Sequence, residues 1–513
     1  MNVSETAIQM RDITKTFGSV VANDKVCLDI RRGEILSLLG ENGSGKTTLM
    51  NILSGIYFPD EGEILVDGKE VKIRSPKHAY DLGIGMVHQH FKLVDVLTAA
   101  ENIVLGLPGK GRLDMKAVGK RVLDISSQYG FEVDPEKKIY NMSVSQKQTV
   151  EIVKVLYRGA DILILDEPTA VLTPQEADKL FAVLRNMRDD GKAIVIITHK
   201  LHEVEEISDR VAVMRRGQYV GGMMTAETNA REMTNMMVGR QVSLNIERHE
   251  PKNAETRLVI ENLSVIDVDG VKKLDDVSFD ARSGEVLGIA GISGCGQKEL
   301  LEAIAGLQKV ESGSIAYIHP DTKKAEELIG KNPKEITEMG VALSFVPEDR
   351  LGMGLVGNMD LADNMMLRSF RQGKSAFTDR KSPRNLAEQV VSDLEVVTPG
   401  VSTPVRKLSG GNVQKVLVGR EISSVPRVLM TAYAVRGLDI NSSYTIYDLI
   451  NQQKEKGVAV IFVGEDLDVL LELCDRILVL CGGKVSGVVD ARKINKHEVG
   501  MMMTRLGGGE VKQ

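Results

Sequence analysis

Short aliphatic runs alternate with amphipathic stretches along the first half of the chain. The runs ILSLLG, DILILD, AIVIIT and RVAVMRRG, which begin at residues 35, 161, 193 and 210, have the length and composition of buried strands. Segments 46–56 and 173–191 instead space their apolar residues as helices do. Buried strands that alternate with helices indicate an α/β domain with a largely parallel sheet.

The same pattern returns in the second half of the chain. GEILSLLG at 33–40 matches GEVLGIAG at 284–291, an offset of 251, and Met142-Ser143 matches Leu408-Ser409, an offset of 266. The offset grows by 15, which predicts insertions in the second copy, partly within 317–340. A repeat of this size changes the domain estimate from three to two. We therefore expect domains at 1–240 and 258–513, joined by a polar linker at 241–257.

Composition excludes several classes of protein. The chain has 65 Lys+Arg and 71 Asp+Glu, hence a net charge of 65 − 71 = −6, and it has no Trp. Nucleic-acid binders usually show a basic patch and stacking aromatics, so this class is disfavoured. No segment is long and apolar enough for a membrane span, and the N-terminus does not read as a signal peptide. The four cysteines lack metal-site spacing and are expected to be reduced thiols in a cytoplasmic protein.

A glycine-rich loop follows the first predicted strand, where residues 40–47 read GENGSGKT. This sequence satisfies G-x-x-x-x-G-K-[ST] between a strand and a helix, the context that a phosphate-binding loop requires. In such a loop Lys46 neutralises the β- and γ-phosphates of ATP, and the Thr47 hydroxyl binds Mg²⁺. The candidate ATP-binding residues are Gly40, Glu41, Asn42, Gly43, Ser44, Gly45, Lys46, Thr47 and Thr48.

Two carboxylates follow the apolar run 162–165. Asp166 at the strand tip can hold Mg²⁺, and Glu167 beside it can polarise a water molecule for attack on the γ-phosphorus. Phosphoryl transfer depends mainly on positioning and charge neutralisation, which these groups supply. The pair would be weak evidence alone, but after a phosphate-binding loop it predicts an ATPase.

These motifs together resemble the ATP-binding cassette (ABC) family. The likeness covers nearly the whole chain, with one cassette in each half. The resemblance implies two tandem P-loop domains, each with a RecA-like α/β core, an antiparallel β subdomain and a helical signature subdomain. It also implies that Gln89 is the Q-loop glutamine, which contacts Mg²⁺ and water, and that His199 is the switch histidine at the γ-phosphate. Phe17 stands where the family stacks an aromatic ring on adenine, although an aromatic residue there could equally belong to the core.

The second half departs from the phosphate-binding pattern. Its loop, GISGCGQKE at 291–299, has Gln297 and Lys298 in place of the lysine and the Ser/Thr. Ala432-Tyr433 replaces the Asp-Glu pair. Glu348 and Glu465 replace the Q-loop glutamine and the switch histidine. We therefore expect that this half does not hydrolyse ATP with its own residues.

The ABC signature is divided in the opposite way. The second half keeps it as LSGGN at 408–412, whereas MSVSQ at 142–146 has lost both glycines. Paired glycines at a helix N-terminus form an anion cradle. In ABC dimers each ATP lies between one domain's P-loop and the other's signature, so the resemblance implies one complete site and one degenerate site in an intramolecular head-to-tail pair. The members expected from the second half are Ser409, Gly410, Gly411 and Asn412.

The duplicated form, with EPTAVLT, VPEDR and KLSGGN, resembles the ATP subunits of bacterial monosaccharide and nucleoside importers. The stretches at 88–94 and 157–176 look more like the nucleoside branch, with a ribose or galactose importer as the alternative. The resemblance implies two integral-membrane permeases, an extracytoplasmic binding protein, and a peripheral place on the cytoplasmic side of the membrane. Permease contacts are expected between Gln89 and about residue 115 and in the counterpart after Glu348, where a solvated loop is the alternative.

A soluble tandem cassette that acts on the ribosome or on DNA is the rival from another class. Such proteins usually keep both sites intact, and the ribosomal ones join their halves by a long charged helical linker. Here one site is lost, the linker is short and the net charge is negative. These features favour the importer.

Overall fold

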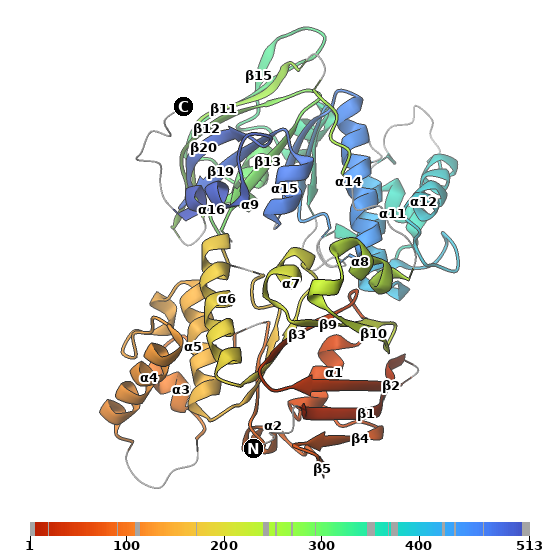
Figure 1. Cartoon of the computed structure of the whole chain (residues 1–513). Coiled ribbons are helices and arrows are strands. Elements are labelled where there is room, and N and C mark those ends of the chain that lie inside the picture. Colours follow the sequence, from red (N-terminus) through yellow and green to blue (C-terminus); the bar gives the residue numbers. More distant parts are fainter. Residues whose placement is uncertain are drawn as a thin grey trace. The chain divides into compact units, whose positions relative to one another are not determined.

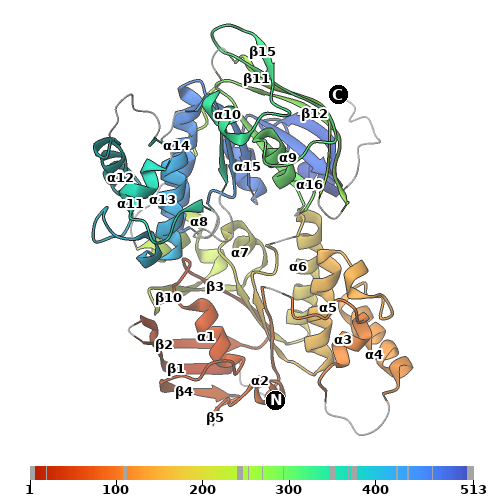
Figure 2. The same ribbon diagram turned by 180° about the vertical axis from the view of Figure 1, so that it is seen from behind.

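The computed structural model divides the chain into two compact units, Met1–Ser243 and Leu244–Gln513 (Figures 1 and 2). The structure describes residues 6–18, 20–89, 91–107, 113–170, 172–239, 246–251, 254–267, 270–292, 294–345, 354–367, 369–370, 378–422, 426–435, 438–464 and 466–504.

A six-stranded sheet forms the core of the first unit, with the strand order β10-β9-β3-β8-β7-β6. Five of its strands are parallel, and β10 pairs antiparallel with β9 at the edge. Strands β3, β6, β7 and β8 are buried along their whole length, as their continuous apolar runs predict. The strands are β3 (Glu34–Leu39), β6 (Ile84–Val87), β7 (Ile162–Asp166), β8 (Ala193–Ile197), β9 (Arg210–Arg215) and β10 (Gln218–Met224).

Two further parts complete the first unit. An antiparallel sheet has the order β2-β1-β4-β5, formed by β1 (Thr6–Phe17), β2 (Val20–Arg31), β4 (Glu61–Val66) and β5 (Lys69–Val71). Figure 1 shows a group of helices at the opposite side of the unit, namely α3 (Ala99–Val104), α4 (Met115–Tyr129) and α5 (Val144–Tyr157). This helical group has its own apolar core. The other helices are α1 (Lys46–Leu53), α2 (Pro76–Asp81), α6 (Pro174–Asp189), α7 (Leu201–Ile207) and α8 (Ala230–Val238).

The second unit repeats this architecture strand for strand. Its large sheet has the order β16-β17-β18-β13-β19-β20, and its antiparallel sheet has the order β12-β11-β14-β15. The strands are β11 (Thr256–Ile266), β12 (Lys272–Arg282), β13 (Val286–Gly291), β14 (Ser312–Ile318), β15 (Ala325–Glu327), β16 (Val341–Phe345), β17 (Val428–Ala432), β18 (Ala459–Val463), β19 (Arg476–Cys481) and β20 (Lys484–Asp490). The helices are α9 (Gln297–Ile304), α10 (Pro333–Glu338), α11 (Leu361–Met366), α12 (Lys381–Asp393), α13 (Gly410–Ile422), α14 (Ile440–Glu455), α15 (Leu467–Leu473) and α16 (Lys496–Thr504). The predicted fold class, two α/β cassettes each with three parts, is confirmed.

One hairpin accounts for part of the increase in the offset between the two copies. In the first unit residues 67–68 join β4 to β5, whereas in the second unit residues 319–324 join β14 to β15. The longer connection falls within the range 317–340, where the sequence predicts an insertion.

The segment 246–250, which we name the strap, packs on the second unit. Ile246 is buried in its core, and the Arg248 guanidinium donates to the carbonyl oxygens of Leu471 and Cys474 at 2.8 and 2.5 Å. The Lys454 ammonium donates to the His249 carbonyl oxygen at 2.5 Å. The strap lies within the predicted linker 241–257, and β11 begins at Thr256 inside the same range. Residues 241–245 and 252–253 of that linker lie outside the described residues.

A matched ion pair shows how the strap changes the second unit. Arg188 pairs with Asp209 at 3.0 Å in the first unit, and both side chains are about one-third exposed. The matching pair, Lys454 and Asp475 at 2.8 Å, is only 2% and 3% exposed. A buried ion pair is tolerated where further hydrogen bonds satisfy it, and here Arg492 and the strap supply them.

A helix that crosses a bilayer needs about 20 mostly apolar residues. None of the helices among the described residues is long and apolar enough for this.

Candidate active site

The phosphate-binding loop lies between β3 and α1, as the motif predicts. Gly45 precedes α1 with φ 97°, in the left-handed region that favours glycine. A Cβ atom at Gly45 would lie 2.2 Å from the Ala22 carbonyl oxygen, so no other residue fits without a shift of the backbone. The Asn23 side chain is fully buried and donates to the Gly45 carbonyl oxygen at 3.1 Å. The loop is thus fixed by β2, a strand of the antiparallel sheet.

The Lys46 side chain is folded into this loop. Its ammonium donates to the carbonyl oxygens of Gly40 and Glu41 at 2.7 and 2.9 Å, and the residue is 8% exposed. Burial lowers the pKa of Lys46 to about 8, although the nearby carboxylates of Glu167, Asp166 and Glu41 oppose this shift. A cation held with incomplete charge compensation is suited to receive an anionic phosphate.

Asp166 and Thr47 meet at the tip of β7. Burial raises the pKa of Asp166 to about 6, the Glu167 charge adds to this shift, and Lys46 and a hydrogen bond from Thr47 oppose it. A nearly buried carboxylate beside a hydroxyl offers the hard oxygen ligands that Mg²⁺ prefers. These residues therefore fit a divalent cation, which would also relieve the cost of the buried charge.

Asp166→Asn is expected to stabilise the ligand-free protein by about 1–3 kcal/mol at about pH 7.5. The pKa of Asp166 is about 6 in the folded protein and 3.8 for an unperturbed aspartate, as in the unfolded chain. Ionised Asp166 therefore destabilises the folded protein above pH 6. This cost shrinks as the pH falls through 6 toward 3.8, and the gain from the substitution shrinks with it. Denaturant unfolding at several pH values measures both effects.

Mg²⁺ and ATP supply the control for this measurement. Saturating MgATP should stabilise the native protein more than the variant, because only native Asp166 offers a carboxylate to the cation. A variant that is less stable than the native protein without ligand would contradict the electrostatic assignment.

The Glu167 carboxylate lies between two predicted site residues. The Gln89 amide donates to Oε2 at 2.7 Å, and Nδ1 of His199 lies 2.9 Å from Oε1. Burial alone would raise the pKa of Glu167, but the His199 contact and the charges of Lys46 and Lys200 outweigh burial and lower it. The carboxylate is therefore ionised near neutral pH, as a general base must be.

Glu167 also has an unusual backbone. Its φ of 47° is in the left-handed region, and its N–H donates to the Ile197 carbonyl oxygen at 2.9 Å. Tyr433, the matching residue of the second unit, has φ 56°, and its N–H donates to the Val463 carbonyl oxygen at 3.0 Å. Both units thus keep this strained turn, but only the first places a carboxylate on it.

Phe17 ends β1 and is 44% exposed. Its ring meets the edge of the Tyr57 ring at a centroid distance of 5.2 Å. This exposed position favours the adenine-stacking role over the alternative of a core residue. Tyr57 was not identified from the sequence, because no motif links it to the loop at Phe17.

The second unit keeps the shape of the phosphate loop without its cation. The Gln297 side chain is 4% exposed and donates to the Ile292 carbonyl oxygen at 3.2 Å. It thus occupies the second unit's loop as Lys46 occupies the loop of the first unit. Lys298, at the Thr47 position, lies 3.7 Å from Glu302. A neutral amide thus replaces the charge. Glu348 and Glu465, the two other replacements predicted here, lie outside the described residues.

The two signature segments differ at their helix N-termini. In the second unit, α13 begins at Gly410. Apart from its chain neighbours and the backbone of the same helix, no described atom lies within 4 Å of where a Cβ would stand on Gly411. Ser409 Oγ accepts from the Asn412 side chain at 2.8 Å. In the first unit Ser143 and Gln146 form a capping box, and Ser145 Oγ lies 3.0 Å from Ser143 Oγ. Side chains therefore occupy the space that glycines leave open in the second unit.

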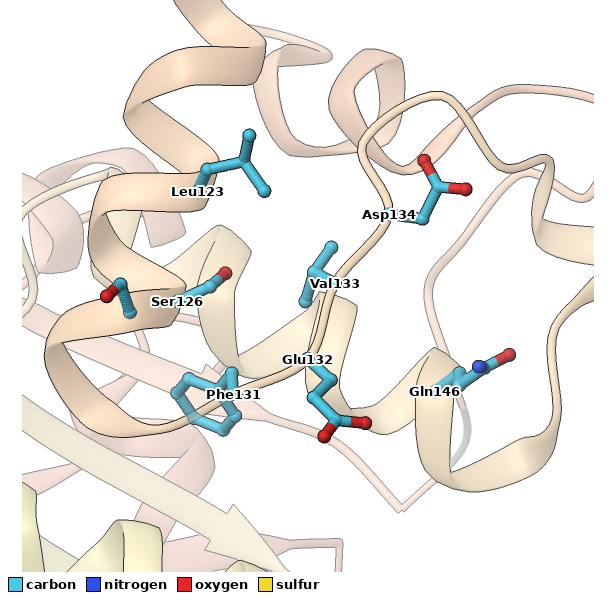
Figure 3. Close-up of a pocket in the computed structure, with 8 residues that line it drawn as sticks. Leu123, Ser126, Phe131, Glu132, Val133, Asp134 and Gln146 are labelled. Atoms are coloured by element: carbon cyan, nitrogen blue, oxygen red, sulfur yellow. The ribbon is translucent and has the colours of Figure 1, made fainter.

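A hollow of about 580 Å³ lies apart from these residues in the first unit's helical group (Figure 3). Figure 3 shows Leu123 of α4 facing the loop that carries Val133 and Asp134, with Gln146 at the start of α5. None of the predicted site residues lines this hollow.

The fold and this site define a class of protein. The family model described as ABC transporter matches residues 23–170 and 274–431, once in each unit. The chain belongs to the ABC transporter family and is an ATPase of that family, whose domains bind ATP.

Individual relatives match over nearly their full lengths. The chain is 43% identical to the nucleoside import ATP-binding protein NupA of Lactococcus lactis, over 99% of this chain and 100% of the relative. It is 42% identical to the guanosine import ATP-binding protein NupO of Bacillus subtilis, over 97% of both chains. It is 40% identical to the glucose import ATP-binding protein TsgD13 of Haloferax volcanii, over 99% of this chain and 96% of the relative.

A solved structure matches both units together. The archaeal ribosome recycling factor aABCE1, solved in complex with a ribosomal stalk protein, covers 94% of this chain and 90% of its own with a TM-score of 0.61. Its sequence identity is 17%, so this likeness shows the fold alone.

Proposed function

We propose that this chain is the ATPase subunit of a bacterial ABC importer that takes up a nucleoside through partner permeases. One observation carries the ATPase part of this proposal: the first unit places Lys46, Asp166 and a doubly contacted Glu167 around one loop, whereas the second unit has the neutral Gln297 in place of the lysine. A chain with one complete and one neutral phosphate loop is suited to a single hydrolytic event per cycle.

In the proposed mechanism the residues of the first unit act in turn on one ATP. Lys46 exchanges its two backbone carbonyl partners for phosphate oxygens, and Phe17 stacks on adenine. Thr47, Asp166 and Gln89 would hold Mg²⁺, which would supply positive charge to neutralise the phosphates. Glu167 accepts the proton of the attacking water, and His199 orients the Glu167 carboxylate. The Gln89 amide is exposed and donates a hydrogen bond to Glu167, and from there it positions the same water.

The second unit is proposed to close this site. Ser409, Gly410, Gly411 and Asn412 form an open helix N-terminus, which suits the γ-phosphate of an ATP bound to the first unit. The first unit's own signature segment is filled by side chains, so it is a poor cradle for a nucleotide on the second unit. These halves complement each other in a head-to-tail pair within one chain.

The proposed partners are two integral-membrane permeases and, indirectly, an extracytoplasmic substrate-binding protein. The chain would lie on the cytoplasmic side of the membrane as a peripheral subunit. The segment after Gln89, through about residue 115, is the proposed permease contact, and exposed Val94, Val96 and Leu113 give it an apolar surface. Its counterpart after Glu348 begins outside the described residues.

The proposed solute rests on relatives rather than on the site. Nucleoside and guanosine importers are named among relatives at 43% and 42% identity, and a glucose importer is named at 40%. The nucleoside branch is favoured, with a simple sugar as the alternative. The soluble rival, a ribosome or DNA ATPase, is supported by fold likeness at 17% identity only.

Uptake measurements in the native host test the proposal. Deletion of the gene should abolish ATP-dependent uptake of a labelled nucleoside and leave uptake of labelled ribose unchanged. Affinity purification of the tagged chain should recover two polytopic membrane proteins. Loss of ribose uptake alone would favour the sugar alternative, and recovery of ribosomes without membrane proteins would support the soluble rival.

A further inference from the structure

We propose that Glu151 and Lys154 of α5 are positioning residues for Gln89, because they attach the chain just after Gln89 to the helical group. We expect loss of these attachments to displace the Gln89 amide from Glu167. This inference rests on the proposed function of Gln89 and Glu167.

Both backbone polar groups of Lys92, its N–H and its carbonyl oxygen, are held by side chains of α5. The Lys92 N–H donates to Glu151 Oε1 at 2.6 Å, and the Lys154 ammonium donates to the Lys92 carbonyl oxygen at 3.0 Å. Lys154 also lies 3.6 Å from the second Glu151 oxygen. Glu151 is 5% exposed, so removal of either partner leaves a buried group without its contact.

A second attachment follows two residues later. The Asn102 side chain of α3 accepts from the Val94 N–H at 2.7 Å and donates to the Val94 carbonyl oxygen at 3.1 Å. Asn102 is 1% exposed. Residues 92 and 94 are therefore attached to the helical group, whereas β6, which ends at Val87, belongs to the large sheet. Gln89 lies on the short connection between the two.

A comparison of the two units distinguishes contacts that the fold requires from contacts found only in the unit with the catalytic residues. In the second unit Asn364 holds Val356 in the same way, at 2.9 and 3.1 Å, and Arg420 donates to the Gly354 carbonyl oxygen at 3.0 Å. The amide and the cation are thus common to both units. Glu151, however, is matched by Leu417, which packs where a Cβ would stand on Gly354. The buried carboxylate that holds the N–H belongs to the unit that has Gln89 and Glu167.

This difference argues against a purely structural role for Glu151. Leucine serves the same helix position in the second unit, so the fold does not require a carboxylate there. Three Cα–Cα steps join Gln89 to Lys92 and span at most about 11 Å, so a displacement of Lys92 changes the positions that Gln89 can reach. Misplacement of a positioning group by about 1 Å costs up to about 100-fold in rate.

The test compares Glu151→Leu with Glu151→Gln in the full-length chain. Glu151→Leu should lower kcat for ATP hydrolysis about tenfold and change KM for ATP less than twofold, because the phosphate loop is not touched. Glu151→Gln keeps an oxygen that accepts the Lys92 N–H and should retain at least half of kcat. Equal losses in the two variants, or an unchanged kcat in Glu151→Leu, would overturn the proposal.

Leu417→Ala supplies the matched control in the second unit. It should lower the thermal midpoint at least as much as Glu151→Leu, because it opens a cavity in a buried helix, yet kcat per folded molecule should stay within twofold. If Glu151→Leu does not fold, Lys154→Met and Lys154→Arg replace it. The methionine should lower kcat and the arginine, which the second unit uses as Arg420, should restore it.

Failure of this inference can be told from failure of the proposed function. An inactive Glu167→Gln with a fully active Glu151→Leu rejects the positioning role alone. An active Glu167→Gln rejects the site itself.

Discussion

Glu167→Gln is expected to abolish steady-state ATP hydrolysis while ATP binding persists. The Glu167 carboxylate is ionised and accepts contacts from Gln89 and His199, so it is placed to take the proton of the attacking water. The amide cannot accept that proton, and loss of a general base costs about 10²–10⁴-fold in rate. Lys46 and the loop glycines are untouched, so ATP affinity should change little. Phosphate release and equilibrium binding of labelled ATP measure the two effects.

The second unit provides the control for this substitution. Tyr433→Gln introduces the same side chain on the same left-handed turn, at φ 56°, in the unit without the carboxylate. Turnover per folded molecule should stay within about twofold. Substantial residual hydrolysis in Glu167→Gln would refute the assignment of the base.

Gly411→Asp is expected to reduce hydrolysis at least about 100-fold, although residue 411 lies in the unit without a catalytic carboxylate. Apart from its two chain neighbours and the backbone of its own helix, no described atom lies within 4 Å of the Cβ position of residue 411, so the new side chain fits the fold. An acidic residue in the first turn of α13 also favours the helix. The same carboxylate would repel the γ-phosphate of an ATP bound to the first unit. Hydrolysis and thermal stability are measured on the same preparation.

Ser145→Asp is the matched control for the signature segments. Ser145 is the first unit's counterpart of Gly411 and already carries a side chain near Ser143. If the first unit's signature faces only the neutral loop, Ser145→Asp should leave turnover within about twofold. An equal loss in both variants would contradict the division into one complete and one degenerate site.

The parts of the site that lie next to long apolar runs were predictable from the sequence. Asp166 ends a strand that is buried at every position, Glu167 follows it directly, and the loop of Lys46 follows another such strand, so motif and strand support each other. The two cassettes and their parallel sheets were predictable for the same reason. Continuous apolar runs and a matching repeat leave few other ways to bury the chain.

Contacts between distant polar residues were not predictable. Lys92 and Glu151 are 59 positions apart, and one of the bonding groups is a backbone N–H that every residue has. The sequence predicts that the strap belongs to a linker, because polar residues are typical of solvent-exposed segments. Arg248 and His249 instead meet backbone carbonyls and a lysine of the second unit, and only the folded chain creates these partners.

The strap also limits how the two units can be exchanged between molecules. Gly239 caps the C-terminus of α8 in the first unit, and Ile246 is buried in the second. Six residues, 240–245, therefore join these two points along the chain. Seven Cα–Cα steps span at most about 25 Å. In the head-to-tail pair proposed above, the first unit would meet the second unit of its own chain at an effective concentration in the millimolar range, as expected for a short tether. Separate subunits would pair at random and form like-with-like dimers, whereas this chain has a fixed stoichiometry. Because of that constraint, the second unit can lack the phosphate-binding lysine and the Asp-Glu pair without inactive dimers being formed.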